Sequence, residues 1–343
     1  MVASMFENII GHTENKKFLQ RLVLTDQHPH ALLFYGAEGI GKACLAREFA
    51  RAFLCLGQEQ ERPCGRCESC RLLNFVSGNL AHPDYLYVEP DQAGKLKMIK
   101  TEQMHDLIAK AAFGPVLGRR KICIINEADT LNQEAANAFL KLLEEPPSGW
   151  LFILVAAQRE RLLPTILSRL IQVRFYPLTL EETTTALQQQ GCTAPEAQVL
   201  ARLAAGSLGT ALRYRQIGAL EMRDRALAYL EQFPLAAPAC FLAEQDYYSR
   251  LLPENEDQLL FTQMLEYLLR DLLFIKLDLT GKLFNCDLPD KLQELAAAWP
   301  QKNLPQAVKA AGAAAFNVKR RSGFKPVLDI LTFTLNDCSE GRA

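Results

Sequence analysis

Residues 31–53 read ALLFYGAEGIGKACLAREFARAF, and this stretch decides the fold of the first part of the chain. Five mainly apolar residues precede a glycine-rich segment, which is followed by apolar residues at helical spacing. This order predicts a buried strand, a tight loop and a helix. The pattern GxxxxGK lets backbone N–H groups converge on phosphate oxygens while the lysine adds positive charge. The predicted phosphate loop contains Gly36, Gly39, Gly41 and Lys42.

Strands and helices continue to alternate beyond this loop. Three further apolar runs predict strands, at residues 121–125, 151–156 and 171–175. Residues 133–143 predict a helix between the first and second of these runs. Such alternation is typical of a parallel sheet with helices on both faces. We therefore expect an α/β domain over residues 1–176.

The character of the sequence changes after Pro177. Residues 177–220 are rich in Ala, Leu and Gln at helical spacing, and Thr179 with Glu182 matches a capping box. From 221 to 338, strand signals are scarce and apolar residues again recur at helical spacing. The sequence therefore predicts a small helical domain followed by a larger all-helical domain.

Composition limits the cellular setting and the kinds of partner. No apolar run approaches the roughly 20 residues that cross a bilayer, and residues 1–8 lack a signal-peptide pattern. We therefore expect a cytoplasmic protein without a membrane span. A formal net charge of -1 provides no global attraction to nucleic acid. The basic clusters at 119–121 and 319–321 are interpreted as solvated surface charge.

Four of the ten cysteines are gathered within sixteen positions, at Cys55, Cys64, Cys67 and Cys70. Four thiolates can close a tetrahedral shell around a structural Zn²⁺ and leave no position for a substrate. The polar residues between the cysteines disfavour simple buried thiols. An iron–sulfur cluster is the minor alternative. His82 lies nearby in sequence and is interpreted as a loop residue rather than a ligand.

Two positions that would support magnesium are altered. Ala43 stands where the phosphate-loop motif has a metal-binding Ser or Thr, and Asn126 stands where an aspartate would follow the second strand. Glu127 keeps the water-orienting position, but a carboxylate is of little use there when the metal is weakly held. We expect a degraded Mg²⁺ site with weak or no hydrolysis. Whether the loop still binds ATP or ADP is left open.

These features resemble the bacterial clamp-loader branch of the AAA+ family. The resemblance lies in the order of several segments, namely 30–34, the cysteine knuckle, 82–84, 118–121, 137–147 and 163–169. It implies an AAA+ domain with a zinc knuckle, a helical lid over 177–220 and a helical collar for oligomerisation over 221–338.

The resemblance also assigns roles to single residues. Ser168-Arg169 matches the family's SRC motif without its cysteine, and Arg169 would act in trans as an arginine finger. Ala156 replaces the polar residue that senses the gamma-phosphate. Gly209 stands where a second sensor arginine is expected, and Arg213 lies one helical turn away. The missing elements favour a subunit that does not hydrolyse ATP itself.

The function implied by the resemblance is assembly of a pentameric ring that opens the sliding clamp and places it on primed DNA. The partners would be the tau/gamma ATPase subunits and the delta subunit of DNA polymerase III. Two alternatives stay open, a catalytically active tau/gamma-type ATPase and a zinc-dependent DNA-binding module with a vestigial nucleotide site. The near-neutral charge disfavours the DNA-binding module.

Overall fold

The computed structural model describes residues 5–25, 28–75, 77–91, 97–235, 247–248 and 250–342. Within them, no helix is long and apolar enough to span a membrane. The chain divides into two compact units. The first consists of Met1–Ala186 and Gly206–Gly209, and the second of Leu187–Ala205 and Thr210–Ala343.

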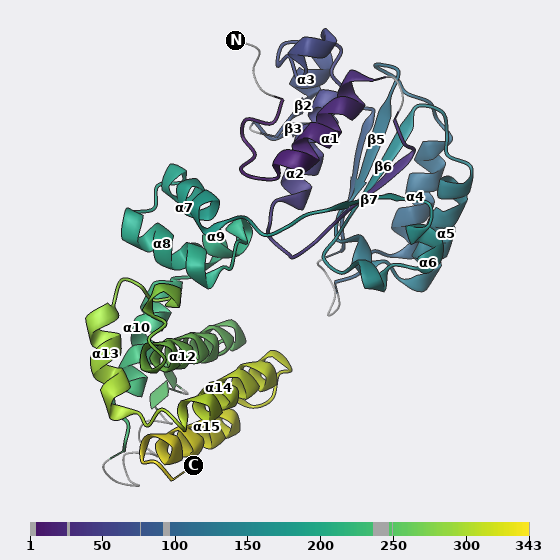
Figure 1. Cartoon of the computed structure of the whole chain (residues 1–343). Coiled ribbons are helices and arrows are strands. Elements are labelled where there is room, and N and C mark those ends of the chain that lie inside the picture. Colours follow the sequence, from purple (N-terminus) through teal and green to yellow (C-terminus); the bar gives the residue numbers. More distant parts are fainter. Residues whose placement is uncertain are drawn as a thin grey trace. The chain divides into compact units, whose positions relative to one another are not determined.

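A five-stranded parallel sheet forms the centre of the first unit, in the order β4-β5-β6-β1-β7 (Figure 1). The bounds of the strands, in that order, are Tyr85–Val88, Lys121–Ile125, Trp150–Ala156, Ala31–Tyr35 and Ile171–Arg174. Tyr35 pairs in register with Ala156 on one side and Arg174 on the other. The carboxyl ends of these strands therefore lie at one edge, where α/β proteins place their ligand sites.

Helices cover both faces of this sheet (Figure 1). Along β1, Leu32 and Phe34 contribute to one apolar core, whereas Ala31 and Leu33 contribute to the other. This alternation follows from the two-residue period of a strand, and burial on both faces explains the nearly continuous apolar runs. The first core includes residues of α1 (Thr13–Leu24) and α2 (Lys42–Phe53); the second includes residues of α4 (Thr101–Ala111), α5 (Gln133–Glu144) and α6 (Pro164–Leu167).

A small insertion separates α2 from the edge strand β4. It contains the short helix α3 (Glu68–Leu72) and a two-stranded antiparallel ribbon of β2 (Leu73–Asn74) and β3 (Asn79–Leu80). A 3₁₀ turn, η1, spans Glu59–Glu61. This insertion carries the four clustered cysteines. Two further 3₁₀ turns, η2 (Ala128–Thr130) and η3 (Arg159–Arg161), follow β5 and β6.

Helices form the described part of the second unit. The long helix α12 packs against α10, α13 and α14, and α14 packs against α15. Leu260, Leu265 and Leu272 of α12 are fully buried in the apolar core of this unit. The helices are α8 (Ala194–Leu203), α10 (Ala219–Leu230), α12 (Asn255–Lys276), α13 (Pro289–Ala298), α14 (Leu304–Lys319) and α15 (Phe324–Ser339), with the 3₁₀ turn η4 at Thr280–Lys282. Helices α7 (Leu180–Gln189) and α9 (Leu208–Gln216) each have residues in both units.

The α/β fold with a helical C-terminal part, expected from the sequence, is confirmed. The capping box at the start of α7 is also present, since Thr179 and Glu182 exchange side chain to backbone hydrogen bonds. The edge strand β4 and the helix α4 were not predicted. The division into three domains at 176 and 220 stays a prediction.

Candidate functional site

The phosphate loop joins β1 to α2, as the sequence predicts. The loop has three glycines with positive φ values: Gly36 at 147°, Gly39 at 73° and Gly41 at 99°. Residues with a side chain rarely adopt such backbone angles. A Cβ atom at Gly36 would lie 2.4 Å from the carbonyl oxygen of Phe175. Backbone geometry therefore requires glycine here, whether or not a phosphate binds.

Lys42 is bonded to the loop that it follows. Its Nζ donates hydrogen bonds to the carbonyl oxygens of Gly36, at 2.7 Å, and of Ala37, at 2.6 Å. Its side chain is buried, and burial lowers the pKa of the ammonium against the opposing charge of Asp129. The ammonium group that would bind a phosphate therefore donates two hydrogen bonds to backbone carbonyls of the same loop.

Residues 206–209 of the chain return to the phosphate loop. The Ser207 Oγ donates to the Glu38 carbonyl oxygen at 2.9 Å, and the Gly209 N–H donates to the Gly39 carbonyl oxygen at 2.8 Å. A Cβ atom at Gly209 would lie 3.0 Å from the Cα and the carbonyl oxygen of Gly39. The close backbone approach explains why glycine stands where the family resemblance led us to expect an arginine.

His12 completes the contacts of the loop. Its Nε2 lies 2.6 Å from the Ile40 carbonyl oxygen, so this nitrogen carries the proton. Burial lowers the pKa of His12, while the bond to Ile40 opposes that shift. Every carbonyl oxygen from 36 to 40 therefore accepts a hydrogen bond from the chain itself.

The positions for magnesium and water lie at the carboxyl end of β5 and the start of α2. Ala43 and Asn126 offer no charged oxygen there. Glu127 has a left-handed backbone, with φ 52°, and its Oε1 accepts a hydrogen bond from Lys97 Nζ at 2.6 Å. This bond raises the pKa of Lys97. The carboxylate that would orient water is therefore paired with an ammonium, a contact that no local sequence signal indicates.

The gamma-phosphate sensor position is apolar. Strand β6 ends at Ala156, which pairs in register with Tyr35 just before the phosphate loop. The following backbone N–H groups, of Ala157 and Gln158, donate to the two carboxylate oxygens of Asp129 at 3.3 and 3.1 Å. Asp129 thus fixes the backbone just after β6. The side chain at 156 is a methyl group and cannot contact a phosphate.

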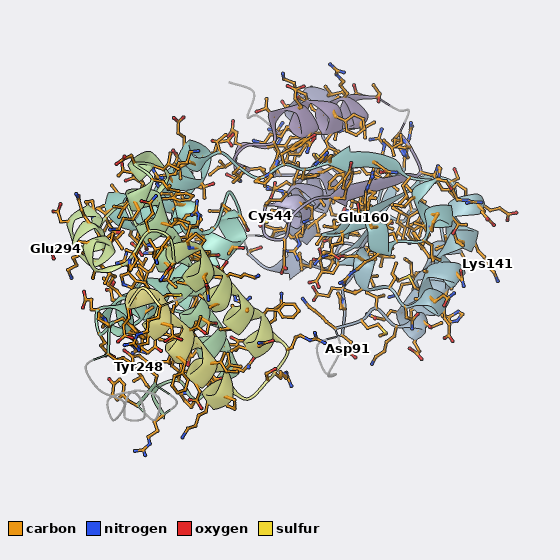
Figure 2. All side chains as sticks on the ribbon, turned by 60° about the horizontal axis from the view of Figure 1, so that its bottom comes forward. Cys44, Asp91, Lys141, Glu160, Tyr248 and Glu294 are labelled. Carbon is orange, nitrogen blue, oxygen red and sulfur yellow. The ribbon has the colours of Figure 1, made fainter. Side chains whose placement is uncertain are left out.

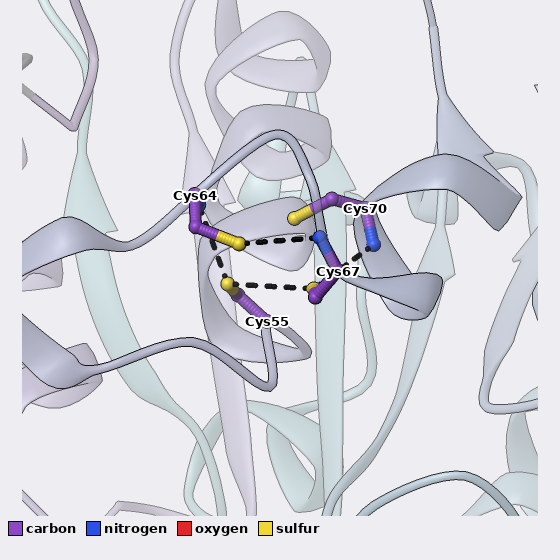
Figure 3. Close-up of side chains that lie close together, drawn as sticks. All are labelled: Cys55, Cys64, Cys67 and Cys70. Atoms are coloured by element: carbon purple, nitrogen blue, oxygen red, sulfur yellow. Dashed lines mark hydrogen bonds between the residues drawn. The ribbon is translucent and has the colours of Figure 1, made fainter.

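All four predicted cysteines come together in the insertion after α2 (Figure 3). The sulfur atoms of Cys55, Cys64, Cys67 and Cys70 all lie within 4.8 Å of one another, and those of Cys55 and Cys67 are 3.9 Å apart. Tetrahedral bonding to one ion at about 2.3 Å places sulfur atoms roughly 3.8 Å apart. This cluster can therefore bind a metal ion.

Backbone N–H groups support the sulfur atoms as acceptors. Gly57 donates to the Cys55 sulfur at 3.3 Å. Figure 3 shows the other three bonds, in which Cys64 donates to Cys55 at 3.4 Å, Cys67 donates to Cys64, and Cys70 donates to Cys67. The hydrogen bond between Cys55 and Cys70 lowers the pKa of Cys55 and raises the pKa of Cys70, because the two sulfur atoms share one proton. Thiolates, rather than thiols, bind metals, so an ion in this cluster would displace that proton.

His82 links the cysteine cluster to the sheet. Its Nδ1 accepts from the Asp84 backbone N–H at 3.0 Å, so its Nε2 carries the proton and donates to Ser69 Oγ at 2.9 Å. The Ser69 hydroxyl in turn donates to the Leu54 carbonyl oxygen at 2.8 Å. His82 is thus a buried positioning residue beside the cluster, consistent with its interpretation as a residue that is not a ligand.

The carboxylate of Asp84 extends this network to the segment before β5. Its two oxygens accept from the backbone N–H groups of Val116, at 2.7 Å, and Leu117, at 2.8 Å. Asp84 is fully buried. The insertion, the start of β4 and the segment leading into β5 are therefore joined by one chain of hydrogen bonds.

Arg169 lies just after α6, apart from the elements of the phosphate loop in sequence. Its Nη1 donates to the Thr165 carbonyl oxygen at 2.7 Å, and its Nη2 pairs with Glu144 Oε1 at 2.8 Å. About a third of the side chain is exposed. Two acceptors thus contact the guanidinium, which is partly exposed at the surface of its unit. Arg213, the candidate to replace a sensor arginine, pairs loosely with Glu256 at 3.9 Å.

Two protein-family models match this chain. A family model described as "DNA polymerase III, delta subunit" matches residues 11–179, and one described as "DNA polymerase III, delta subunit, C terminal" matches residues 236–320. Together they cover the α/β unit and much of the helical part.

Two curated relatives carry the name DNA polymerase III subunit delta'. The protein from Pseudomonas aeruginosa is 40% identical over 59% of this chain and 60% of its own length. The protein from Bacillus subtilis is 30% identical over 86% of this chain and 87% of its own length. Tau and gamma subunits also match, but the matched part spans only 24% to 45% of their lengths.

A solved structure shares the fold over nearly the whole chain. The gamma subunit-related protein of Thermotoga maritima has a TM-score of 0.51 and 18% identity, covering 94% of this chain and 99% of its own. At this identity the likeness shows only the fold. The match to the Bacillus subtilis delta' subunit over 87% of its length carries the assignment, because the tau and gamma matches cover less than half of those proteins. The chain belongs to the DNA polymerase III delta' subunit family.

Proposed function

We propose that this chain is the non-hydrolysing delta' subunit of a DNA polymerase III clamp loader and helps to load the sliding clamp on primed DNA. Its partners in this proposal are the tau/gamma ATPase subunits and the delta subunit, in a cytoplasmic hetero-oligomer. The family assignment supports a place in the polymerase assembly. The state of the nucleotide site supports the non-hydrolysing role.

One observation carries this proposal. The groups that would bind magnesium, orient water and sense the gamma-phosphate are replaced or engaged together, at Ala43, Asn126, Glu127 and Ala156. Hydrolysis of a nucleoside triphosphate needs a metal and a positioned water, so loss of these groups removes the catalytic rather than the structural part of the site. Glycines and Lys42 persist, and ATP or ADP held there would be a structural ligand.

Arg169 is the catalytic residue in this proposal, acting on ATP bound to a neighbouring tau/gamma subunit. A guanidinium supplied in trans stabilises charge on the transferring phosphate and can contribute roughly 10³ to 10⁵ in rate. Three of its five N–H groups remain after the bonds to Thr165 and Glu144. These are sufficient for bidentate contact with phosphate oxygens.

The test is a ring reconstituted from this chain and its tau/gamma and delta partners. Arg169→Ala should leave the ring assembled but lower clamp-stimulated ATP hydrolysis at the adjacent tau/gamma site by about 10³, because the finger is removed. Arg169→Lys keeps the positive charge but lacks the planar guanidinium, so its hydrolysis rate should stay close to that of Arg169→Ala. Full activity of both variants would contradict the finger, and failure of the ring to assemble would make Arg169 an interface residue instead.

A second measurement separates this role from that of a catalytic tau/gamma-type ATPase. The isolated chain should show negligible turnover. The variant Ala43→Ser/Asn126→Asp should not restore it, because Lys97 still pairs with Glu127 and Ala156 still lacks a polar group. Turnover typical of AAA+ motors, abolished by Lys42→Ala, would contradict the non-hydrolysing role.

The metal in this proposal is one structural Zn²⁺ on Cys55, Cys64, Cys67 and Cys70. Four thiolates fill a tetrahedral shell, so the ion would hold the insertion together and take no part in a reaction. The clustered sulfurs and their N–H donors support this choice. Metal analysis of unchelated protein should find one zinc per chain, whereas iron with sulfide would indicate a cluster instead.

We further propose the three-domain organisation in which residues 177–220 form a lid and residues 221–338 a collar. The helices found throughout the described part of 177–338 and the return of residues 206–209 to the phosphate loop support this division, although its boundaries differ from those of the two compact units. A truncation ending at 220 should then stay folded but fail to join the ring. If the truncated chain assembles as well as the full chain, the collar assignment is wrong.

A further inference from the structure

The contact between Arg169 and Glu144 joins two segments 25 residues apart. Glu144 is the last residue of α5, and its Oε1 accepts from Arg169 Nη2 at 2.8 Å. The Thr165 carbonyl oxygen, from the turn of α6 just before Arg169, accepts from Nη1 at 2.7 Å. Two acceptors from different elements therefore define the direction of one guanidinium plane.

The place of Glu144 in its helix is electrostatically unfavourable on its own. The carboxyl end of a helix carries partial negative charge and favours cations rather than carboxylates. Lys141, in the last turn of α5, is the cation expected there, but its exposed side chain extends outward (Figure 2). Arg169 supplies the positive charge that Glu144 contacts. The pairing thus gives a reason for a carboxylate at this end of α5.

The contact contributes little to folding stability. The side chains of Arg169 and Glu144 are 35% and 52% exposed, and ion pairs in such positions are weak. Its larger effect is on conformational freedom, since a free arginine samples many rotamers and two fixed acceptors select one. A group that must meet a phosphate in a defined geometry gains from this selection.

We propose that Glu144 is a positioning residue that holds the Arg169 guanidinium in the orientation needed to reach a phosphate on the adjacent subunit. This inference rests on the proposed role of Arg169 as a finger. Glu144 touches no substrate in this scheme and acts only through Arg169. The next residue, Glu145, has the same charge and is exposed, but the bond to Arg169 comes from Glu144.

The neighbouring pair provides a matched experiment in the reconstituted ring. Glu144→Ala should lower the kcat of clamp-stimulated ATP hydrolysis at the adjacent tau/gamma site by about tenfold, since misplacement of a catalytic group costs rate. The KM for ATP should not change, because nucleotide contacts lie on the partner. Glu144→Gln keeps an acceptor oxygen at the same reach and should stay within about threefold of the wild type. Glu145→Ala should match the wild type.

A double variant tests whether Glu144 acts through Arg169. Arg169→Ala/Glu144→Ala should be no slower than Arg169→Ala alone, because the orienting residue has nothing left to orient. Equal rates for Glu144→Ala and Glu145→Ala, or a faster Glu144→Ala ring, would overturn the positioning role. If Arg169→Ala itself has no effect, the finger proposal fails; if only Arg169→Ala is slow, this inference alone fails.

Discussion

The two ends of helix α2 carry two sites that differ in how complete they are. At the amino end, the carbonyl oxygens of 36–40 bond to groups of the same chain, and the positions for metal and water are altered. Just beyond the carboxyl end, four sulfur atoms gather with backbone N–H support and form a full ligand set. The first site has no charged oxygen at its expected magnesium positions, whereas the second has four sulfur atoms that could bind one metal ion.

The difference shows that the backbone conformation of a phosphate loop can be stabilised without the residues that bind magnesium. The phosphate loop keeps its shape because Lys42, Ser207 and Gly209 satisfy its backbone from within. Changes at Ala43 or Asn126 therefore cost the fold little. A tetrahedral metal site has no such replacement, since removal of one thiolate leaves an open shell. Substitutions at the two ends of α2 should consequently differ in size.

The largest effect is expected in the cysteine cluster. Cys67→Ala should abolish stoichiometric metal binding and destabilise the insertion by several kcal/mol, since structural zinc contributes directly to folding. Metal analysis and thermal unfolding measure both effects. Cys44→Ala, at an exposed cysteine outside the cluster, is the control and should behave as the wild type. Unchanged metal content in Cys67→Ala would show that the four cysteines do not bind the metal together.

The next largest effect is expected at His82. His82→Ala removes the acceptor of the buried Asp84 N–H and the donor to the Ser69 oxygen, while the Ser69 hydroxyl keeps its bond to Leu54; the loss should cost about 1 to 3 kcal/mol in the free energy of unfolding. Denaturant unfolding measures it. His105 is exposed on α4, so His105→Ala should change stability by less than about 0.5 kcal/mol. Similar losses in the two variants would mean that the network beside the cluster contributes little.

A smaller effect is expected at the phosphate loop. Alanine at 209 improves helix propensity by about 1 kcal/mol, but its Cβ would lie 3.0 Å from the backbone of Gly39. The loop must shift to admit it, so we expect net destabilisation by about 1 kcal/mol. Gly114 has open space around its Cβ position, and Gly114→Ala should be neutral or slightly stabilising. A more stable Gly209→Ala would show that the loop is loosely held.

The smallest effect concerns pH, because a partly buried histidine, His12, lies near one end of α2 and a buried one, His82, near the other. Burial lowers the pKa of both His12 and His82 below 6.5. Below pH 6.5 the unfolded chain binds protons that the folded chain does not, so stability should fall as pH drops toward the folded pKa values. NMR titration of the ring nitrogens measures these values directly, without interference from metal release.

Substitution separates the two histidines. Protonation of His82 breaks its bond from the Asp84 N–H, whereas the His12 bond to Ile40 survives in the imidazolium form. The free energy of unfolding should therefore depend less on pH, below pH 6.5, in His82→Gln than in His12→Gln. Equal slopes in the two variants would contradict this assignment of protons.

Much of the fold was predictable because its signals are local. The runs at 31–35 and 121–125 coincide with β1 and β5, since apolar runs bounded by loops indicate buried strands. The strand β4 was missed because only four residues form it and Tyr85 and Tyr87 alternate with apolar neighbours at the sheet edge. The role of Arg169 and the identity of the metal stay predictions.

The sequence by itself determined the strand, loop and helix around 31–53, the grouping of four cysteines and the presence of Ala43 and Asn126 where magnesium ligands are expected. Each of these depends on residue type and short spacing, which the chain carries directly. Only the tertiary structure decided that Lys97 pairs with Glu127, that Gly209 approaches Gly39, and that Arg169 donates to Glu144. These pairs lie from 25 to 170 residues apart in the sequence and meet only because the packed sheet and helices place them together, so no local pattern indicates them.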